Sequence, residues 1–332
     1  MDLILFQLDA YADQGIIDSK FHRLVTEFYH SYCAFSQSPV RMKERQKLFG
    51  TLFNLILKEK QTPHQFSIFH ESLRHPFDYY QFGLDFIRPF VDFEHSRLFG
   101  LDQLKKIREQ LTRGENVILL ANHQIEPDPQ IISLLLEKTD PALAAEMIFV
   151  AGHRVVKDPV AIPMSLGRNL LCIYSKKHVS HPPEEKSEKV TLNQRTLKKM
   201  QELLHAGGKC IYVAPSGGRD RPHPSGEFHV APFDPQSIEL FYLLGRNAEH
   251  LTHFYPLSLK THQLMPPPCQ VEKELGEKRV IHYTPVYITF GNELDMEYFP
   301  GSEVSDKKEK RKMRTDYIWQ EVCKNYAAFI VD

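Results

Sequence analysis

Hydrophobic residues follow two different spacings along the chain, and these spacings divide it into two parts. Over residues 1–78 they recur every three or four positions, which is the spacing of helices with one apolar face. One such set lies in residues 21–29 and a second in residues 48–57. Neither set contains a cluster of chemically reactive side chains. We therefore predict a small helical bundle over residues 1–78, whose role is packing, and a second domain over residues 79–332.

The second part opens with an aromatic-rich connector and then alternates short apolar runs with helical patterns from about residue 101. The short runs predict strands at 117–121, 147–151, 170–174, 210–214, 253–259 and 286–290. The helical patterns fall at 101–113, from 128 onward, at 191–205 and at 234–247. Strands that alternate with helices are typical of a parallel sheet. The predicted fold class is α/β, with a mixed, mainly parallel sheet flanked by helices and preceded by the N-terminal helical bundle.

The segment between the first predicted strand and the helix after it carries a candidate catalytic pair. His123 follows the strand, and Asp128 and Pro129 precede the apolar pattern of the helix. Aspartate is common at the N-cap and proline in the first turn, so we expect the helix to begin there. Ligands bind at the carboxyl ends of the strands in such sheets. A turn can bring Asp128 against His123, and a carboxylate partner supports an imidazole as a general base.

Spacing by itself does not identify this pair. His153 and Asp158 are also separated by four residues, and Asp158 also precedes a proline. Position and pattern therefore leave both pairs open. Ser216 lies in Ala-Pro-Ser-Gly-Gly and lacks the Gly-x-Ser-x-Gly context of a nucleophile elbow, so no serine nucleophile is predicted.

Two further predicted strands end in basic residues. Lys177 and His178 follow the third strand, and Arg219 and Arg221 follow the fourth. If these strands are parallel neighbours of the first, their loops leave the same edge of the sheet and the four side chains converge near His123. Four potential cations require an anion, and a phosphate dianion is the simplest choice. Taken separately, each basic cluster is also typical of a solvated loop or a surface ion pair.

Composition narrows the classes of partner. Hydrophobic residues make up 42% of the chain and charged residues 25%, and the formal net charge of −1 provides no overall field for a nucleic-acid partner. No apolar run approaches the ~20 residues of a transmembrane segment, and the first residues lack the basic region of a signal peptide. The five cysteines are scattered, with no Cys-x-x-Cys pair, which fits reduced thiols. Neither a metal nor another cofactor is predicted.

Four motifs occur in order between about residues 115 and 260. They are Asn122-His-Gln-Ile-Glu-Pro-Asp128, Phe149-Val-Ala-Gly-His-Arg-Val, Gly167-Arg-Asn-Leu-Leu-Cys-Ile-Tyr-Ser-Lys-Lys-His178 and Ile211-Tyr-Val-Ala-Pro-Ser-Gly-Gly-Arg-Asp-Arg-Pro222. In this order and spacing they resemble the soluble, plastid-type glycerol-3-phosphate 1-O-acyltransferases. The resemblance selects His123 and Asp128, because the family's histidine lies in the Asn-His-Gln motif. The fourth motif has Ser-Gly-Gly-Arg where the wider superfamily has Glu-Gly-Thr-Arg, which argues against a lysophosphatidate acyltransferase.

The resemblance implies transfer of a fatty acyl group to the sn-1 hydroxyl of glycerol-3-phosphate, the first step of glycerolipid synthesis, without an acyl-enzyme. It makes His123 the general base and Asp128 the residue that orients it. It places glycerol-3-phosphate on four residues: Lys177, His178, Arg219 and Arg221. The implied acyl donor is a thioester of acyl carrier protein, with acyl-CoA as a substitute, in the cytoplasm or an organelle stroma.

Two other functions stay open. A different acyltransferase of the same superfamily would keep His123 and Asp128 but not the four basic residues. A non-catalytic lipid-binding or carrier-binding module would transfer no acyl group at all. Six of the eight residues at 307–314 are basic. This run is either the solvated face of a C-terminal helix or a docking patch for an acidic acyl carrier protein.

Overall fold

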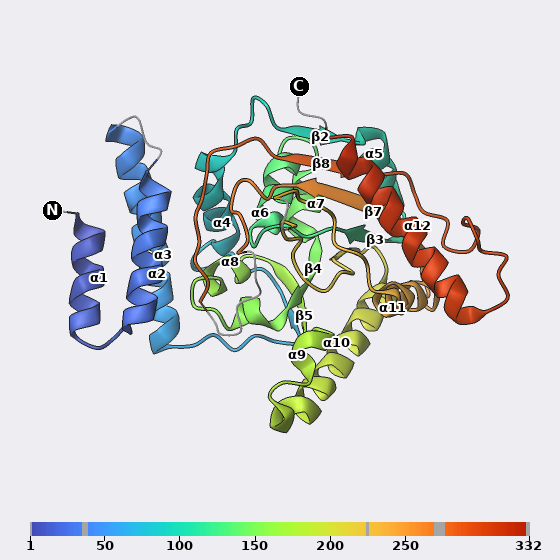
Figure 1. The fold of residues 1–332 in the computed structure, drawn as a ribbon, viewed down its shortest axis with the longest axis horizontal. Helices are drawn as coiled ribbons and strands as arrows, with labels where there is room; N and C mark the ends of the chain where they lie inside the picture. The colour runs from blue at the N-terminus through green and yellow to red at the C-terminus, as the bar shows by residue number, and fades with distance from the viewer. Residues whose placement is uncertain (1, 35–38, 224–225, 269–275, 330–332) are drawn as a thin grey trace.

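The computed structural model describes residues 2–34, 39–223, 226–268 and 276–329, except for the side chains of residues 176 and 177. Its centre is an eight-stranded sheet with the strand order β1-β5-β4-β6-β3-β7-β8-β2 (Figure 1). The strands are β1 (Phe69–His70), β2 (Arg97–Phe99), β3 (Asn116–Ala121), β4 (Ile148–Gly152), β5 (Asn169–Ile173), β6 (Cys210–Val213), β7 (Thr252–Lys260) and β8 (Tyr287–Phe290). Strands β3 to β7 are parallel, whereas β1 is antiparallel to β5, and β8 to β7. The predicted fold class is confirmed.

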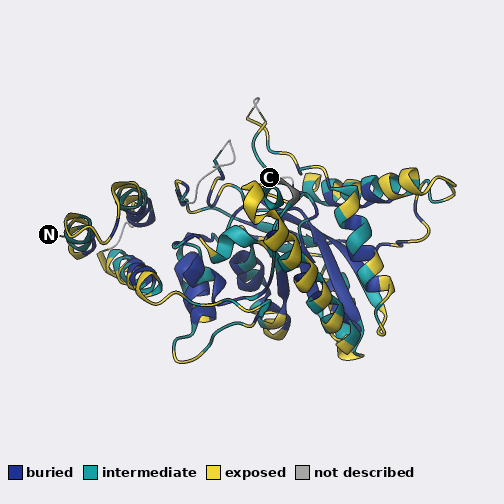
Figure 2. Cartoon of the chain, turned by 90° about the horizontal axis from the view of Figure 1, so that it is seen from below, coloured by how far each residue is buried: buried dark blue, intermediate teal, exposed yellow. Residues whose placement is uncertain are grey.

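Helices cover both faces of this sheet, and Figure 2 shows the buried strands between helices whose outer surfaces are exposed. The helices are α1 (Leu3–Asp13), α2 (Ser19–Cys33), α3 (Pro39–Gln61), α4 (Tyr79–Ile87), α5 (Leu101–Thr112), α6 (Asp128–Leu136), α7 (Pro141–Glu146), α8 (Ile162–Ser165), α9 (Lys176–Val179), α10 (Lys186–Ala206), α11 (Pro235–Arg246) and α12 (Lys307–Ala327). Within the described ranges, no helix is both long and apolar enough to cross a membrane.

The strand β3 is buried along its whole length and pairs with β6 on one side and β7 on the other. Val117 and Leu119 point into the apolar core shared with α4 and α6. Ile118 and Leu120 point into the core shared with α10, α11 and α12. Successive side chains of a strand alternate between faces, so a parallel strand covered on both faces needs a continuous apolar run. That requirement explains why this strand was detectable from sequence.

The N-terminal helices α1, α2 and α3 share the first of these cores with α4. Tyr32 of α2 stacks on Phe86 of α4 with 4.3 Å between ring centroids, and its hydroxyl donates to the Phe86 carbonyl at 2.8 Å. Residues 1–78 are therefore largely helical, as predicted. The strand β1 nevertheless lies within that range and pairs with β5. The division of the chain at residue 78 stays a prediction.

Three features of the fold differ from what the hydrophobic pattern suggested. The strand β5 is not a neighbour of β3, because β4 and β6 lie between them; three strand spacings amount to roughly 14 Å. The strands β1 and β2 contain two and three residues, too few for a recognisable pattern. For the helix over residues 21–29 the sequence also suggests Ser19 as the N-cap, but the cap of α2 is Asp18, whose carboxylate accepts the Phe21 N–H at 2.8 Å.

Candidate active site

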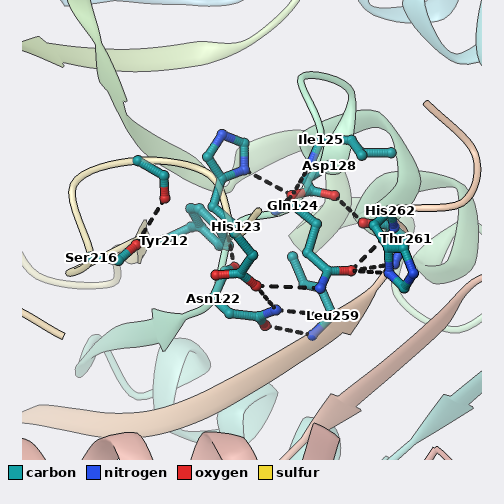
Figure 3. Close-up of polar contacts among 12 residues, drawn as sticks. Asn122, His123, Gln124, Ile125, Asp128, Tyr212, Ser216, Leu259, Thr261 and His262 are labelled. Atoms are coloured by element: carbon teal, nitrogen blue, oxygen red, sulfur yellow. Dashed lines mark hydrogen bonds and ion pairs between the residues drawn. The ribbon is translucent and has the colours of Figure 1, made fainter. Parts of the chain in front are cut away.

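The loop between β3 and α6 holds His123 against Asp128 (Figure 3). The distance between His123 Nδ1 and Asp128 Oδ2 is 2.8 Å, and the side chains are 28% and 0% exposed, respectively. A buried carboxylate beside Nδ1 favours the tautomer with the proton on that nitrogen. The opposite nitrogen, Nε2, is then an acceptor and points away from Asp128 (Figure 3).

The Asp128 carboxylate is held on all sides. Its Oδ2 also accepts the backbone N–H groups of Gln124 at 2.7 Å and Ile125 at 3.1 Å. Its Oδ1 accepts the Thr261 hydroxyl at 2.6 Å, directly after the end of β7. Asp128 is the first residue of α6, and Pro127, not Asp128, occupies the N-cap. The expected N-cap role was wrong, because the carboxylate turns back onto its own loop instead of onto the helix.

Two amide side chains fasten the same loop to the neighbouring strand β7. Asn122 donates from Nδ2 to the Leu259 carbonyl at 2.9 Å and accepts the Leu259 N–H on Oδ1 at 2.8 Å. Gln124 accepts the Thr261 N–H on Oε1 at 2.8 Å. The Asn122 and Gln124 side chains thus bond to backbone groups of β7 and of the residue after it, as a neighbouring strand would, and these bonds position the loop.

Asp220 connects this loop to the segment that follows β6. Its backbone N–H donates to the His123 carbonyl at 2.6 Å. Its Oδ2 accepts the Asn122 amide at 2.9 Å and its Oδ1 accepts the Ala231 N–H at 2.9 Å. Burial raises the pKa of Asp220 to about 6, although these hydrogen bonds act in the opposite direction. Asp220 was not predicted as a site residue; it stands between two arginines that were.

Arg219 directly precedes Asp220, which bonds to the His123 loop, but a carboxylate already occupies the Arg219 guanidinium group. Arg219 Nη1 and Nη2 donate to the two oxygens of Glu277 at 2.7 and 2.6 Å. The two side chains are 14% and 9% exposed. Burial alone would lower the pKa of Arg219, and the bonds to Glu277 raise it above its ordinary value. Paired, planar contact with two oxygens is also the geometry in which an arginine binds a phosphate group.

The other three predicted phosphate ligands are spread more widely. Arg221 donates from Nη1 to the Pro268 carbonyl. Lys177 and His178 lie in α9, after β5 and on the same edge of the sheet as β3, but three strands away. The side chain of Lys177 lies outside the described part of the chain. The structure thus ties the segment that holds Arg219 and Arg221 to the His123 loop through Asp220, and it places α9 three strand spacings away from β3.

The competing pair, His153 and Asp158, is not brought together. Asp158 accepts Arg279 Nη2 at 3.1 Å, and His153 stacks on Tyr174 with 4.3 Å between ring centroids. Among the described residues, His153 Nδ1 is buried without a hydrogen-bond partner. Burial lowers the pKa of His153. With a lowered pKa and no carboxylate partner among the described residues, His153 is the weaker candidate for the base. The geometry therefore favours the pair that the family resemblance had selected.

An apolar cavity of about 100 Å³ opens beside the His123–Asp128 loop. The loop and the start of α6 contribute Pro127, Pro129 and Gln130 to its wall. The remaining wall comes mainly from apolar side chains of α2, α3, α4, β4 and α8, among them Phe28, Leu52, Phe86, Phe149 and Met164. A hydrocarbon group is the natural occupant of such a space.

Known proteins with similar sequences point to one enzyme family. A family model described as "Acyltransferase" matches residues 104–260. The chloroplastic glycerol-3-phosphate acyltransferase of Carthamus tinctorius is 41% identical over 328 residues, which cover 97% of this chain and 71% of that protein. The chloroplastic glycerol-3-phosphate acyltransferase ATS12 of Cucurbita moschata is 45% identical over 272 residues, which cover 82% of this chain and 59% of that protein. The chloroplastic glycerol-3-phosphate acyltransferase of Spinacia oleracea is 44% identical over 247 residues, which cover 74% of this chain and 52% of that protein.

The chain belongs to the glycerol-3-phosphate acyltransferase family. The matched segments span just over half of the Cucurbita and Spinacia relatives. The resemblance inferred from the four motifs is confirmed. The sequence did not single out four residues that the structure places around His123, Asp128 and Arg219, namely Gln124, Asp220, Thr261 and Glu277. Each is far in sequence from at least one of the partners it holds. Gln124 and Asp220 stood inside recognised motifs, whereas Thr261 and Glu277 did not.

Proposed function

We propose that this protein transfers a fatty acyl group from a thioester to the sn-1 hydroxyl of glycerol-3-phosphate. The observation that carries the proposal is the 2.8 Å contact between His123 Nδ1 and Asp128 Oδ2, at the carboxyl end of the central parallel strand. The loop of this pair contributes Pro127 to the wall of the apolar cavity, and the His123 carbonyl accepts the Asp220 N–H of the arginine-bearing segment after β6. These surroundings suit an acyl chain and a phosphate.

Proton transfer in this proposal uses the exposed side of the His123 ring. His123 Nε2 takes the proton of the sn-1 hydroxyl while its oxygen attacks the thioester carbonyl carbon. The new C–O bond forms, the C–S bond breaks, and the imidazolium returns the proton to the leaving thiolate. The buried negative charge of Asp128 stabilises the transient imidazolium. General-base catalysis of this kind contributes about 10²- to 10⁴-fold.

The two substrates occupy different walls of the site. The acyl chain lies in the apolar cavity beside Pro127 and Pro129. The phosphate binds Arg219 and Arg221, with Lys177 and His178 as its further ligands from α9. Because the phosphate is remote from the reacting carbon, its binding energy positions the hydroxyl without taking part in bond changes. The relatives' names include the word chloroplastic, which supports a plastid stroma as the compartment. We propose a thioester of acyl carrier protein as the acyl donor, with acyl-CoA as a substitute.

The test is an acyl-transfer assay with purified protein, glycerol-3-phosphate and an acyl-carrier thioester. His123→Ala should lower kcat by at least about 10²-fold while glycerol-3-phosphate still binds. Asp128→Asn should be milder, because the amide oxygen still accepts His123 Nδ1 and the Thr261 hydroxyl can accept the new N–H. The matched control is His153→Ala, which should retain most activity.

Two results would remove the assignment. Unchanged turnover in His123→Ala would mean that another group takes the proton. Equal losses in His123→Ala and His153→Ala would mean that the second pair takes part despite its geometry. A protein that binds both ligands but transfers no acyl group under any condition would be a binding module.

A further inference from the structure

Two buried arginines line the apolar cavity beside the catalytic loop, and their surroundings differ. Arg279 donates from Nε and Nη2 to Glu126 at 2.7 and 3.0 Å and from Nη2 to Asp158 at 3.1 Å. Arg168 has no carboxylate partner among the residues that the structure describes. It donates from Nη1 to the Ser133 hydroxyl at 2.6 Å. Its guanidinium carbon lies 4.8 Å from the centroid of the Tyr80 ring.

Among the described residues, two of the three nitrogen atoms of the Arg168 guanidinium lack a hydrogen-bond partner, and the neighbouring Tyr80 side chain offsets only part of the effect of burial on the pKa of Arg168. Within the described part of the chain, Nε and Nη2 are buried and have no hydrogen-bond partner. Burial lowers the pKa of Arg168 to about 10, so the side chain is still charged at neutral pH. A buried charge without an opposite charge is costly, and one neutral hydroxyl and one aromatic face compensate it only in part. The cavity wall therefore carries a cation that can gain an anionic partner.

The Arg168 guanidinium bonds to α6 more than one helical turn beyond Asp128. Ser133 follows Asp128 by five residues on α6, which corresponds to about 7–8 Å along the helix. Arg168 itself directly precedes β5 and is 3% exposed. The rest of the wall offers apolar side chains such as Phe28, Leu52 and Phe86. A mostly apolar space with one unpaired cation matches a ligand that has one hydrocarbon chain and one carboxylate.

We propose that this cavity binds a free long-chain fatty acid, with the carboxylate on Arg168 and the chain along the apolar wall. The carboxylate completes the hydrogen bonds of Nε and Nη2 and neutralises the guanidinium. In this orientation the carboxyl carbon lies away from His123, so the fatty acid is not a substrate. It competes with the acyl chain of the thioester donor, and this consequence rests on the function proposed above.

Direct binding tests the site without any acyl transfer. Palmitate and palmityl alcohol have the same chain length and differ at the head group, so their relative affinity isolates the carboxylate. In calorimetric titration the wild-type protein should bind palmitate roughly 10- to 100-fold more tightly, as expected for a charge-assisted hydrogen-bonded pair. Arg168→Met should remove this difference, and Arg168→Lys should keep part of it. Equal affinity of the wild-type protein for the acid and the alcohol would overturn the proposal.

Thermal unfolding without lipid provides a second, independent measurement. Replacing an unpaired buried charge by an apolar side chain of similar length should leave Tm unchanged or raise it, so Arg168→Met should be at least as stable as wild type. Arg279→Met is the matched control, and it should lower Tm because Glu126 and Asp158 lose their partner. If Arg168→Met unfolds, or loses as much stability as Arg279→Met, then the protein itself satisfies the guanidinium and the proposal fails.

The fatty-acid site and the proposed reaction can fail separately. A protein that binds palmitate through Arg168 but transfers no acyl group supports the site and rejects the reaction. A protein that transfers acyl groups but binds the acid and the alcohol equally supports the reaction and rejects the site. If both stand, palmitate should raise the KM for the acyl thioester in wild type far more than in Arg168→Met.

Discussion

The pairing of Arg219 with Glu277 makes a quantitative prediction about glycerol-3-phosphate. Arg219→Ala removes a cation next to the catalytic loop and also leaves the buried Glu277 carboxylate without its main partner. The phosphate then loses an attraction and meets a negative charge. Glu277→Gln removes only the competing negative charge. The double variant removes both charges, so its affinity for glycerol-3-phosphate should lie between those of the two single variants.

The size of the effect follows from the distances. One unit charge about 4 Å from another is worth about 4 kcal/mol at an effective dielectric constant of 20. Solvent and side-chain rearrangement reduce this, and we expect about 1–3 kcal/mol. Arg219→Ala should therefore raise the KM for glycerol-3-phosphate by roughly 5- to 150-fold. Glu277→Gln should lower it several-fold, because Arg219 then meets the phosphate without a competing carboxylate.

Steady-state kinetics with each substrate varied separately provide the measurement. The KM for the acyl thioester should stay near its wild-type value in all three variants, because the acyl chain is proposed to lie in the apolar cavity and not on Arg219 or Glu277. Neutral glycerol as acceptor is the control, and its transfer rate should not respond to either charge. If Arg219→Ala raises both Michaelis constants alike, or leaves that for glycerol-3-phosphate unchanged, Arg219 does not hold the phosphate.

Two further predictions concern pH and the acyl carrier. Because the pKa of Asp220 is about 6 in the folded protein and 3.8 ordinarily, the folded state binds this proton more tightly, and its free energy of unfolding should fall as pH rises from about 4 to about 6. In urea unfolding, the decrease in unfolding free energy over this pH range should be about 3 kcal/mol smaller for Asp220→Asn than for the wild-type protein. If the two proteins show the same pH dependence, the raised pKa does not belong to Asp220. Lys308 and Lys312 of α12 are exposed, and replacing both with Glu leaves Arg311 paired with Glu239 at 3.2 Å. This variant should have a several-fold lower kcat/KM with the carrier-protein donor at low salt, and an unchanged kcat/KM with acyl-CoA. Equal effects on both donors would leave this run as a solvated helix face.

Local patterns in the sequence predicted the parts of the fold whose causes are local. The strand β3 is a continuous apolar run because it is buried on both faces, and His123 and Asp128 meet across a single turn. The partners of the site come from elsewhere in the chain. Thr261 reaches Asp128 from 133 residues away, and Glu277 reaches Arg219 from 58. Those contacts depend on strand order, which no local pattern specifies.

The same limit explains the prediction about the four basic residues. Sequence placed their loops on one edge of the sheet, and β5 and β6 are indeed parallel to β3. It could not show that β4 and β6 separate β5 from β3. Asp220, which stands between Arg219 and Arg221, therefore reaches the His123 loop directly, whereas α9 follows a strand that lies three strand spacings from β3.

The cavity wall has a consequence for how this protein can change. Phe28 and Leu52 belong to α2 and α3, in the helical part of the chain that carries none of the proposed chemistry, yet they face the same space as the catalytic loop. If the acyl chain fills that cavity, part of the cavity's shape is determined by α2 and α3, whose residues do not have to preserve the proposed chemistry. A substitution at Leu52 can then alter which chains fit and leave His123 and Asp128 untouched. Preference for an acyl chain and the ability to transfer it can therefore evolve along separate paths within one polypeptide.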